Sequence, residues 1–259
     1  MSNVRPDKRL GQHFLHERGV VERIVQAIGP KQDEMVVEIG PGTGVLTKAL
    51  LEEGARVTAI EIDERCWEVL EDLSRAYDNR LTVVRGDALK VLGYTVPVAG
   101  IKVAGNLPYN VGTEIVAQLV ELAYQGADKA PSEMVFMLQK EVIERICAQP
   151  DTRDWGRIGV LCDLLCQRED LFDVAPGAFT PPPKVMSSVA RLTPLPQPRA
   201  EVDPKKLDKV LRLVFGQRRK MLRGVLKGVV SEEQMLALGI DPTWRGEVLD
   251  TVQLCSLAQ

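Results

Sequence analysis

Short apolar runs alternate with longer amphipathic stretches over roughly the first 195 of the 259 residues, and this alternation limits the possible folds most. Runs typical of strands occupy residues 35–40, 57–63, 81–87, 101–105 and 134–139. Stretches with helical periodicity lie between them at residues 44–53, 64–74 and 113–124. Strands separated by helices favour an α/β fold with a mostly parallel sheet covered on both faces. Two further strands, at residues 171–174 and 187–192, are expected to form a hairpin-like pair at one end of the sheet.

A proline-rich stretch, Thr193–Pro198, divides the chain. Its three prolines at alternate positions favour an extended backbone that does not continue a helix. The residues after it show helical periodicity, with Leu207 and Leu211 one turn apart. We therefore predict two domains, a sheet-containing domain at residues 1–195 and a small helical domain at residues 199–259.

The composition, 45% hydrophobic and 27% charged residues, is that of an ordinary soluble globular protein. No stretch approaches the run of about 20 apolar residues that a membrane span needs. The first residues lack the apolar core of a secretory signal, so we expect a cytoplasmic protein with no membrane contact. Five scattered cysteines and only two histidines, His13 and His16, argue against a disulfide framework and against a metal site.

The net charge of −3 conceals an uneven distribution along the chain. The net charge is +2 over residues 1–30, −8 over residues 31–196 and +3 over residues 197–259. Residues 205–227 hold nine Lys and Arg and a single acid, Asp208. A basic run of this kind is often only a solvated helix face, but in an acidic protein it favours phosphate contacts. We expect Gln217–Arg223 to lie on a helix and to contact the phosphates of a nucleic acid without reading its sequence.

The first expected strand runs into a glycine loop, Glu38–Gly44, with the spacing E-x-G-x-G-x-G. Glycines here let the backbone turn sharply and approach a ligand closely. The dinucleotide fingerprint G-x-G-x-x-G, counted from Gly40, would need glycine at position 45, which is Val45. A glycine loop alone indicates only a tight turn, but this spacing is that of methyltransferases that bind S-adenosylmethionine.

Acidic residues follow the next two expected strands. Glu61 lies 21 positions after Gly40, where a carboxylate can accept hydrogen bonds from both hydroxyls of a ribose. Asp87 ends the third strand, where a carboxylate can accept from the amine of an adenine. A single acid at a strand end is more often a solvated charge. Because the carboxyl ends of parallel strands meet at one edge of the sheet, the three strand ends together favour a cofactor crevice.

The fourth expected strand ends in Asn106, Leu107, Pro108 and Tyr109. This loop resembles the signature of amino-methyltransferases that act on the exocyclic nitrogens of bases. In adenine the N6 lone pair is delocalised into the ring, so this amine is a poor nucleophile. The Asn106 side-chain oxygen and the Leu107 carbonyl can accept its two hydrogens and aim the lone pair at a methyl donor. Pro108 fixes the loop, and Tyr109 offers a face for stacking. The plainer alternative is a Pro-Tyr turn after a buried strand.

A base must leave its stack to reach such a site, and a second aromatic wall would hold it there. Phe179 stands just before three consecutive prolines, Pro181–Pro183, which stiffen the segment. We predict that Phe179 packs on the other face of the target base. A core phenylalanine remains the alternative.

These motifs resemble those of the ribosomal RNA small-subunit adenine dimethyltransferase A family. The resemblance covers nearly the whole chain. It rests on residues 8–15, 38–44, 106–109, 136–141, 155–157, 179–185 and 215–220. Among these, His13 stands where the family motif has Asn, and Trp155 where Tyr is usual. Whether position 13 contacts the cofactor through its backbone or its imidazole is left open.

The resemblance implies a Rossmann-like S-adenosylmethionine-dependent methyltransferase domain followed by a small all-α domain that binds RNA or the ribosome. It implies dimethylation of N6 on two adjacent adenosines near the 3′ end of 16S rRNA, within the small subunit or its precursor. A role in small-subunit biogenesis, a monomeric state and the absence of a metal are expected as well. Cofactor contacts carry over onto His13, Leu15, Gly40, Glu61, Asp87 and Asn106.

Three other functions are considered. An adenine methyltransferase directed at 23S rRNA shares the Asn106–Tyr109 loop, but Pro181–Pro183 and Phe215–Lys220 favour the small-subunit enzyme. A non-catalytic ribosome-assembly factor could retain the cofactor crevice. An NAD-dependent oxidoreductase is disfavoured by Val45 and by the lack of a suitable acid for hydride transfer.

Overall fold

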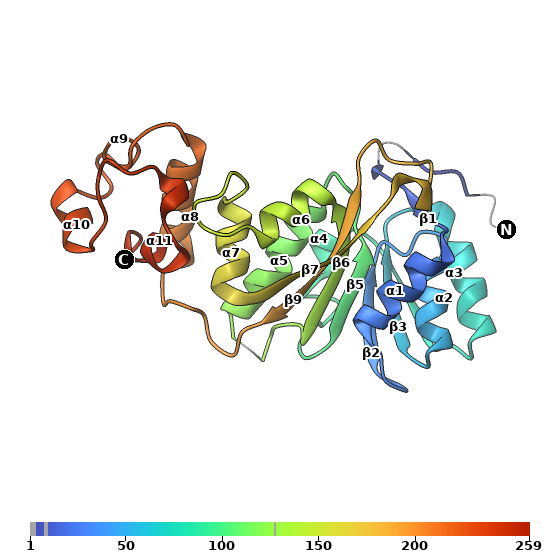
Figure 1. Ribbon diagram of the computed structural model, residues 1–259. Coiled ribbons are helices and arrows are strands. Elements are labelled where there is room, and N and C mark those ends of the chain that lie inside the picture. Colours follow the sequence, from blue (N-terminus) through green and yellow to red (C-terminus); the bar gives the residue numbers. More distant parts are fainter. Residues whose placement is uncertain (1–3, 8–9, 127) are drawn as a thin grey trace. The chain divides into compact units, whose positions relative to one another are not determined.

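The computed structural model describes residues 4–7, 10–126 and 128–259 (Figure 1). Lys8 and Arg9, which begin the first motif, lie outside these residues. The chain divides into two compact units. The first unit comprises Met1–Ile143 and Arg168–Pro194, and the second comprises Glu144–Gln167 and Leu195–Gln259.

A seven-stranded sheet has the strand order β4-β3-β2-β5-β6-β9-β7. Its strands are β2 (Met35–Ile39), β3 (Arg56–Glu61), β4 (Leu81–Arg85), β5 (Lys102–Asn106), β6 (Glu133–Gln139), β7 (Cys166–Val174) and β9 (Ser187–Pro194). The pairs among β4, β3, β2, β5 and β6 are parallel, and β9 runs antiparallel to β6. The predicted α/β fold with a mostly parallel sheet is therefore confirmed, and β9 and β7 are neighbours at one end of that sheet.

The helices of the first unit follow the strands as expected. They are α1 (Arg18–Ile28), α2 (Val45–Glu52), α3 (Glu64–Ala76), α4 (Ala88–Val91), α5 (Gly112–Tyr124) and α6 (Lys140–Cys147), the last of which crosses the boundary into the second unit. In Figure 1, α1, α2 and α3 cover one face of the sheet, and α4 and α5 cover the other. A separate two-stranded sheet pairs β1 (Phe14–Leu15) antiparallel with β8 (Phe179–Thr180).

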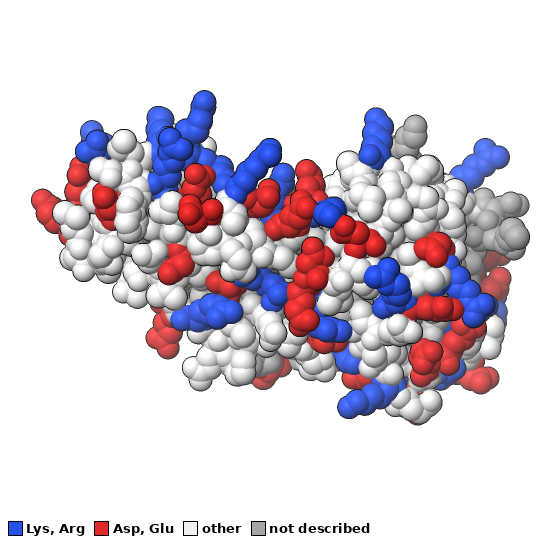
Figure 2. Space-filling model, in the orientation of Figure 1, with Lys and Arg blue, Asp and Glu red and all other residues white. Residues whose placement is uncertain are grey.

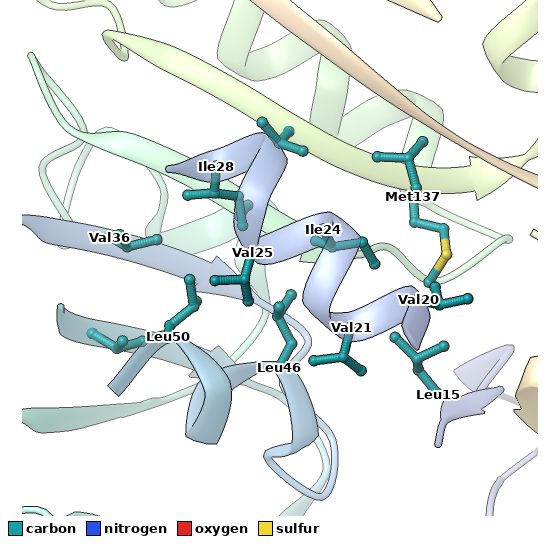
Figure 3. Close-up of a cluster of buried hydrophobic side chains, with 14 of the residues drawn as sticks. Leu15, Val20, Val21, Ile24, Val25, Ile28, Val36, Leu46, Leu50 and Met137 are labelled. Carbon is teal, nitrogen blue, oxygen red and sulfur yellow. The ribbon is translucent and has the colours of Figure 1, made fainter. Parts of the chain in front are cut away.

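Helix α1 shows how the apolar pattern builds the core of the first unit. Its buried side chains recur with helical spacing, at Val20, Val21, Ile24, Val25 and Ile28. They meet apolar side chains of α2 and β2 in one cluster, shown in Figure 3. Burying each aliphatic side chain contributes about 1.5–3 kcal/mol. This packing fixes α1 and α2 on the sheet. The glycine loop, which joins β2 to α2, is thereby held in place.

The second unit is helical, as the fold prediction required. Its helices are α7 (Arg157–Leu165), α8 (Pro204–Gly216), α9 (Leu222–Val225), α10 (Glu232–Ala237) and α11 (Thr251–Ser256), with a short 3₁₀ helix at Gly246–Val248. No helix in the described part of the chain is both long and apolar enough to cross a membrane.

The boundary of the second unit differs from the predicted one, because residues 144–167 belong with the C-terminal helices and not with the sheet. The reason is packing within this unit. Trp155 is fully buried, and its indole N–H donates to the Leu249 carbonyl at 2.9 Å. The Thr251 hydroxyl donates to Asp163 of α7 at 2.5 Å. The division into a catalytic and an RNA-binding part stays a prediction.

Residues 217–221 lie between α8 and α9, and Arg223 already belongs to α9, so the expectation of one helix through Gln217–Arg223 is wrong. Helix α8 ends at Gly216, and the next residues form a turn in which Lys220 N donates to the Gln217 carbonyl at 2.9 Å. Met221 then makes an isolated antiparallel bridge with Arg245 before α9 begins. A turn of this kind can hold several basic side chains close together at the surface, as a helix face would.

Candidate active site

The carboxyl ends of the parallel strands meet at a cavity in the first unit. Gly40 follows β2, Glu61 ends β3, Asp87 follows β4 and Asn106 ends β5, and all four line this cavity. Four residues distant in sequence are therefore brought together, as the strand-end argument requires. His13 and Leu15, from the segment before α1, line it as well.

The glycine loop needs glycine for two separate reasons. Gly40, Gly42 and Gly44 have φ angles of 68°, 55° and 79°, in the left-handed region that disfavours other residues. A Cβ at Gly42 would also lie 2.9 Å from the ring of Phe14. The loop can therefore turn sharply while the N-terminal segment packs directly on it.

Glu61 is a buried carboxylate held by the backbone. Its Oε1 accepts from Asp63 N at 2.8 Å, and its Oε2 accepts from Gly42 N at 2.9 Å. Burial raises the pKa of Glu61, and the two backbone hydrogen bonds oppose this rise. Each carboxylate oxygen can accept more than one hydrogen bond, so the fixed group retains capacity for two ribose hydroxyls.

Glu38 also lines the cavity, although the sequence reasoning assigned it no role. Its side chain is 1% exposed, and burial raises its pKa to about 8. The Thr47 hydroxyl donates to Glu38 Oε2 at 2.6 Å, and the neighbouring Glu61 also raises this pKa. At neutral pH Glu38 is therefore mainly protonated and adds no second full charge beside Glu61. The signal for it was the acidic first position of the E-x-G-x-G-x-G run.

Asp87 caps a helix and faces the cavity at the same time. Its Oδ1 accepts from Leu89 N at 3.0 Å at the start of α4, which fixes the carboxylate. Its Oδ2 lies 3.9 Å from the Lys90 ammonium. Because the cap holds one oxygen, the orientation of the other is set by the backbone.

Asn106 has its amide orientation fixed by the N-terminal segment. Its Nδ2 donates to the His13 carbonyl at 2.9 Å. Within the described residues no hydrogen bond reaches its Oδ1, so the oxygen remains an acceptor. Leu107 N donates to the Met137 carbonyl at 3.1 Å, and Pro108 Cδ lies 3.7 Å from the place that a Cβ on Gly40 would take. The loop is therefore braced from β6 and from the glycine loop.

His13 and Tyr109 form one wall of the cavity. Their ring centroids are 5.2 Å apart and the planes are tilted by 31°. His13 Nδ1 lies 2.7 Å from the Pro181 carbonyl, which can only accept, so this nitrogen carries the hydrogen. The Tyr109 hydroxyl contacts Ser187 Oγ at 2.6 Å, and burial raises the pKa of Tyr109. The imidazole thus braces the proline segment, while the His13 backbone orients Asn106.

Phe179 does not lie where the sequence argument placed it. Its side chain is 2% exposed, belongs to the hydrophobic core and is not among the residues that line the cavity. The cause is the pairing of β8 with β1, in which Phe179 lies opposite the buried Leu15. Phe179 is therefore a core residue, which was the alternative to the prediction that it forms a second aromatic wall.

A polar network that the sequence did not reveal holds the N-terminal segment beside the cavity. Gln12 Nε2 donates to Asp63 Oδ2 at 2.7 Å, and Arg65 pairs with the same carboxylate at 2.6 Å. Arg65 also donates to the Arg5 carbonyl at 3.0 Å. The hydrogen bonds from Arg65 lower the pKa of Asp63, so this anchor stays charged. Its residues are spread over 60 positions, and no motif joins them.

Within the described ranges no group of three or more His, Cys, Asp or Glu side chains could hold a metal ion. The residues that line the cavity supply hydrogen-bond acceptors, glycine backbone and aromatic faces. Three features together define a class of protein. They are a glycine loop that lets the backbone approach a ligand, carboxylate acceptors at the ends of β3 and β4, and an amide oxygen without a protein donor at the end of β5. That class is the S-adenosylmethionine-dependent methyltransferases.

Comparison with known proteins narrows the class to a family. The family model described as Ribosomal RNA adenine dimethylase matches residues 3–258, and the chain belongs to this family. It is therefore an S-adenosylmethionine-dependent ribosomal RNA methyltransferase, which excludes the oxidoreductase alternative.

Relatives and solved structures agree over almost the whole chain. A Pseudomonas aeruginosa protein named Ribosomal RNA small subunit methyltransferase A is 44% identical over 257 residues, 98% of this chain and 94% of that protein. A protein of the same name from Ruegeria sp. is also 44% identical, over 97% of this chain and 90% of that one. A dimethyladenosine transferase from Plasmodium falciparum superposes with a TM-score of 0.78 at 26% identity, covering 95% of this chain and 96% of that one. The 23S rRNA methyltransferase ErmE gives a TM-score of 0.70 at 25% identity, covering 95% and 98%.

Proposed function

We propose that the protein transfers two methyl groups to N6 of each of two adjacent adenosines near the 3′ end of 16S rRNA. The observation that carries the proposal is the Asn106 amide, whose nitrogen is held by His13 and whose oxygen faces no protein donor in the described chain. The relatives named for the small subunit are 44% identical, whereas ErmE is 25% identical. This difference favours the small-subunit RNA over 23S rRNA as the substrate.

The residues of the cavity fit the cofactor. Glu61 would accept from the ribose hydroxyls and Asp87 from the adenine amine, since each is held by backbone N–H groups with acceptor capacity left. Gly40 permits close approach of the backbone, and His13 and Leu15 line the cavity from the N-terminal segment. When bound, S-adenosylmethionine supplies a methyl group activated by the positive charge on its sulfur.

The Asn106–Tyr109 loop would position the acceptor base. Asn106 Oδ1 and the Leu107 carbonyl accept the two hydrogens of the N6 amine, which draws its lone pair out of the ring. Tyr109 stacks on the base, and Pro108 keeps the loop in place. Positioning and electrostatic stabilisation lower the barrier, and the proton released from N6 passes to water.

The partner would be the small ribosomal subunit or its precursor, bound by a monomer in the cytoplasm during subunit biogenesis. Within the described residues Arg219, Lys220, Arg223 and Lys227 have no ion-pair partner, which leaves them available to phosphates. Arg218 differs, because it donates to the Arg153 carbonyl at 2.7 Å and lies 3.4 Å from Glu247. Arg218 is therefore a structural residue of the second unit.

Incubation with labelled cofactor and unmethylated small subunits, followed by nucleoside analysis, tests the proposal. We expect N6,N6-dimethyladenosine in the 16S rRNA. Purified large subunits serve as the matched control. Label in 23S rRNA alone, or a labelled nucleoside other than methylated adenosine, would contradict the proposal. A subunit that binds the protein and gains no label would favour the assembly factor.

A further inference from the structure

Trp244 is the exposed tryptophan of the second unit. Its side chain is 40% exposed, whereas Trp155 of the same unit is fully buried. Tryptophan buries most of its surface in a typical protein, and the part of the ring that stays exposed offers a flat face to a ligand. Trp244 lies in a loop, Asp241–Arg245, between α10 and the 3₁₀ helix Gly246–Val248.

This loop runs directly beside the basic turn. Leu222 N donates to the Trp244 carbonyl at 2.8 Å, and Arg223 N donates to the Pro242 carbonyl at 2.9 Å. Met221 pairs with Arg245 in an antiparallel bridge. These contacts hold the backbone of Trp244 against Met221 and Leu222, which lie between Lys220 and Arg223. Two stretches about 20 residues apart form one surface.

The charges of this surface are mainly positive. Lys220, Arg223 and Arg245 have no ion pair within 4 Å in the described residues. The acid of the loop, Asp241, accepts from Thr243, whose backbone N and hydroxyl donate to it at 2.8 and 2.7 Å, and the charge of Arg223 also lowers the pKa of Asp241. Figure 2 shows Lys and Arg side chains gathered over α8 and α9. An aromatic face beside a cluster of cations matches the chemistry of an unpaired nucleotide, which offers a flat base and a phosphate.

We propose that Trp244 stacks on an unpaired base of the ribosomal RNA while Lys220, Arg223 and Arg245 contact the neighbouring phosphates. The proposal rests on the proposed function for the identity of the RNA. Paired bases hide their faces within a helix, so the ligand is a loop, bulge or single-stranded segment. An acidic ribosomal protein would satisfy the cations, but an unpaired nucleotide carries a flat face and a phosphate in one unit, which makes RNA the better match.

The test measures affinity for unmethylated small subunits, and for protein-free 16S rRNA, at several salt concentrations. We expect Trp244→Ala to weaken binding to both by roughly 5- to 100-fold, the range found when a base-stacking aromatic is removed. The dependence on salt should not change, because no phosphate contact is lost. Trp244→Phe should keep most of the affinity. Trp244→Leu, which keeps apolar bulk without a flat face, should not.

Three controls make the result decisive. Lys220→Gln should lower the salt slope by about 1, unlike any Trp244 variant. Leu236→Ala removes another exposed apolar side chain of the second unit, 62% exposed, and should bind normally. Thermal unfolding and cofactor affinity should match the unsubstituted protein in Trp244→Phe and Trp244→Leu.

Two outcomes would overturn the stacking proposal. One is wild-type affinity of Trp244→Ala or Trp244→Leu for 16S rRNA. The other is a loss seen with subunits but not with protein-free RNA, which would indicate docking on a ribosomal protein. Methylation at saturating subunit concentration is measured in parallel. If the unsubstituted protein forms no dimethyladenosine, the proposed function fails, whatever the binding variants show.

Discussion

The cavity of the first unit and the basic surface of the second unit hold their functional groups in opposite ways. The basic surface is formed by Arg219, Lys220, Arg223 and Lys227. In the cavity Glu61, Asp87 and Asn106 are each fixed by a backbone contact, as Glu61 is by Gly42 N and Asn106 by the His13 carbonyl. On the basic surface Arg219 and Lys220 are solvated and unpaired within the described chain. A site that must orient a reacting amine needs fixed acceptors, whereas contacts to phosphate tolerate mobile cations. Substitutions in the first should therefore affect rate, and those in the second should affect binding.

The largest effect is expected for Asn106→Ala. It removes the acceptor for N6, and we expect kcat to fall roughly 100- to 1000-fold, the size typical of losing one polar contact to the reacting group. Affinity for small subunits should stay within about threefold, since no phosphate contact is touched. Single-turnover methylation and a binding assay measure both. A loss of subunit binding with an unchanged kcat would contradict the assignment of Asn106 to catalysis and not to RNA binding.

The double variant Arg219→Glu with Lys220→Glu should have the opposite signature. RNA affinity should fall roughly 10- to 100-fold and its salt slope by about 2, while cofactor affinity stays unchanged. Arg218→Ala is the matched comparison, because its side chain is already paired with Glu247. It should lower thermal stability and leave the salt slope nearly intact. Equal effects of the two changes on the slope would refute this distinction.

His13 separates positioning from cofactor binding. His13→Ala removes the contact with the Pro181 carbonyl and the ring beside Tyr109, and we expect kcat to fall roughly 10-fold with little change in cofactor affinity. His13→Asn can donate to the same carbonyl and should restore most of the rate. If His13→Ala weakens cofactor binding and leaves kcat unchanged, the imidazole contacts the cofactor directly.

Glu38→Gln should change neither kcat nor RNA binding appreciably, and its effect should appear in the pH dependence of stability. The native state keeps the Glu38 proton up to a pKa of about 8, whereas the unfolded chain loses it near its ordinary value of 4.5. Between these values the native state binds more protons, so stability falls as pH rises, by at most about 1.4 kcal/mol per pH unit. Gln can still accept from Thr47, and this part of the slope should disappear. Urea unfolding from pH 5 to 8 measures it. An identical slope in the variant would mean that Glu38 is ionised.

The sequence was sufficient for features set by local pattern. The strands before Gly40, Glu61 and Asn106 follow from apolar runs, and the meeting of their ends follows from parallel topology. The glycines of the loop were identifiable because their positive φ angles favour glycine over most other residues. Because the backbone geometry at Gly40, Gly42 and Gly44 restricts the residue type, a motif can be recognised in the sequence there.

Features that depend on tertiary contact could not be predicted. Phe179 lies in the core because a two-residue strand pairs it with Leu15, and no periodicity marks so short a strand. The turn after Gly216 interrupts a basic run whose composition is equally compatible with a helix. Residues 144–167 join the second unit through the burial of Trp155 against Leu249, which lies 94 positions away. The raised pKa of Glu38 comes from burial that its sequence neighbours do not reveal.

The orientation of one amide is central to the whole account. A structure with S-adenosylhomocysteine and an RNA that carries the target adenosine tests it most directly. We expect Asn106 Oδ1 within about 3 Å of N6, the usual distance of an N–H···O hydrogen bond, with Nδ2 still donating to His13. An amide turned so that Nδ2 faces the base, or an adenine bound away from Tyr109, would contradict the mechanism.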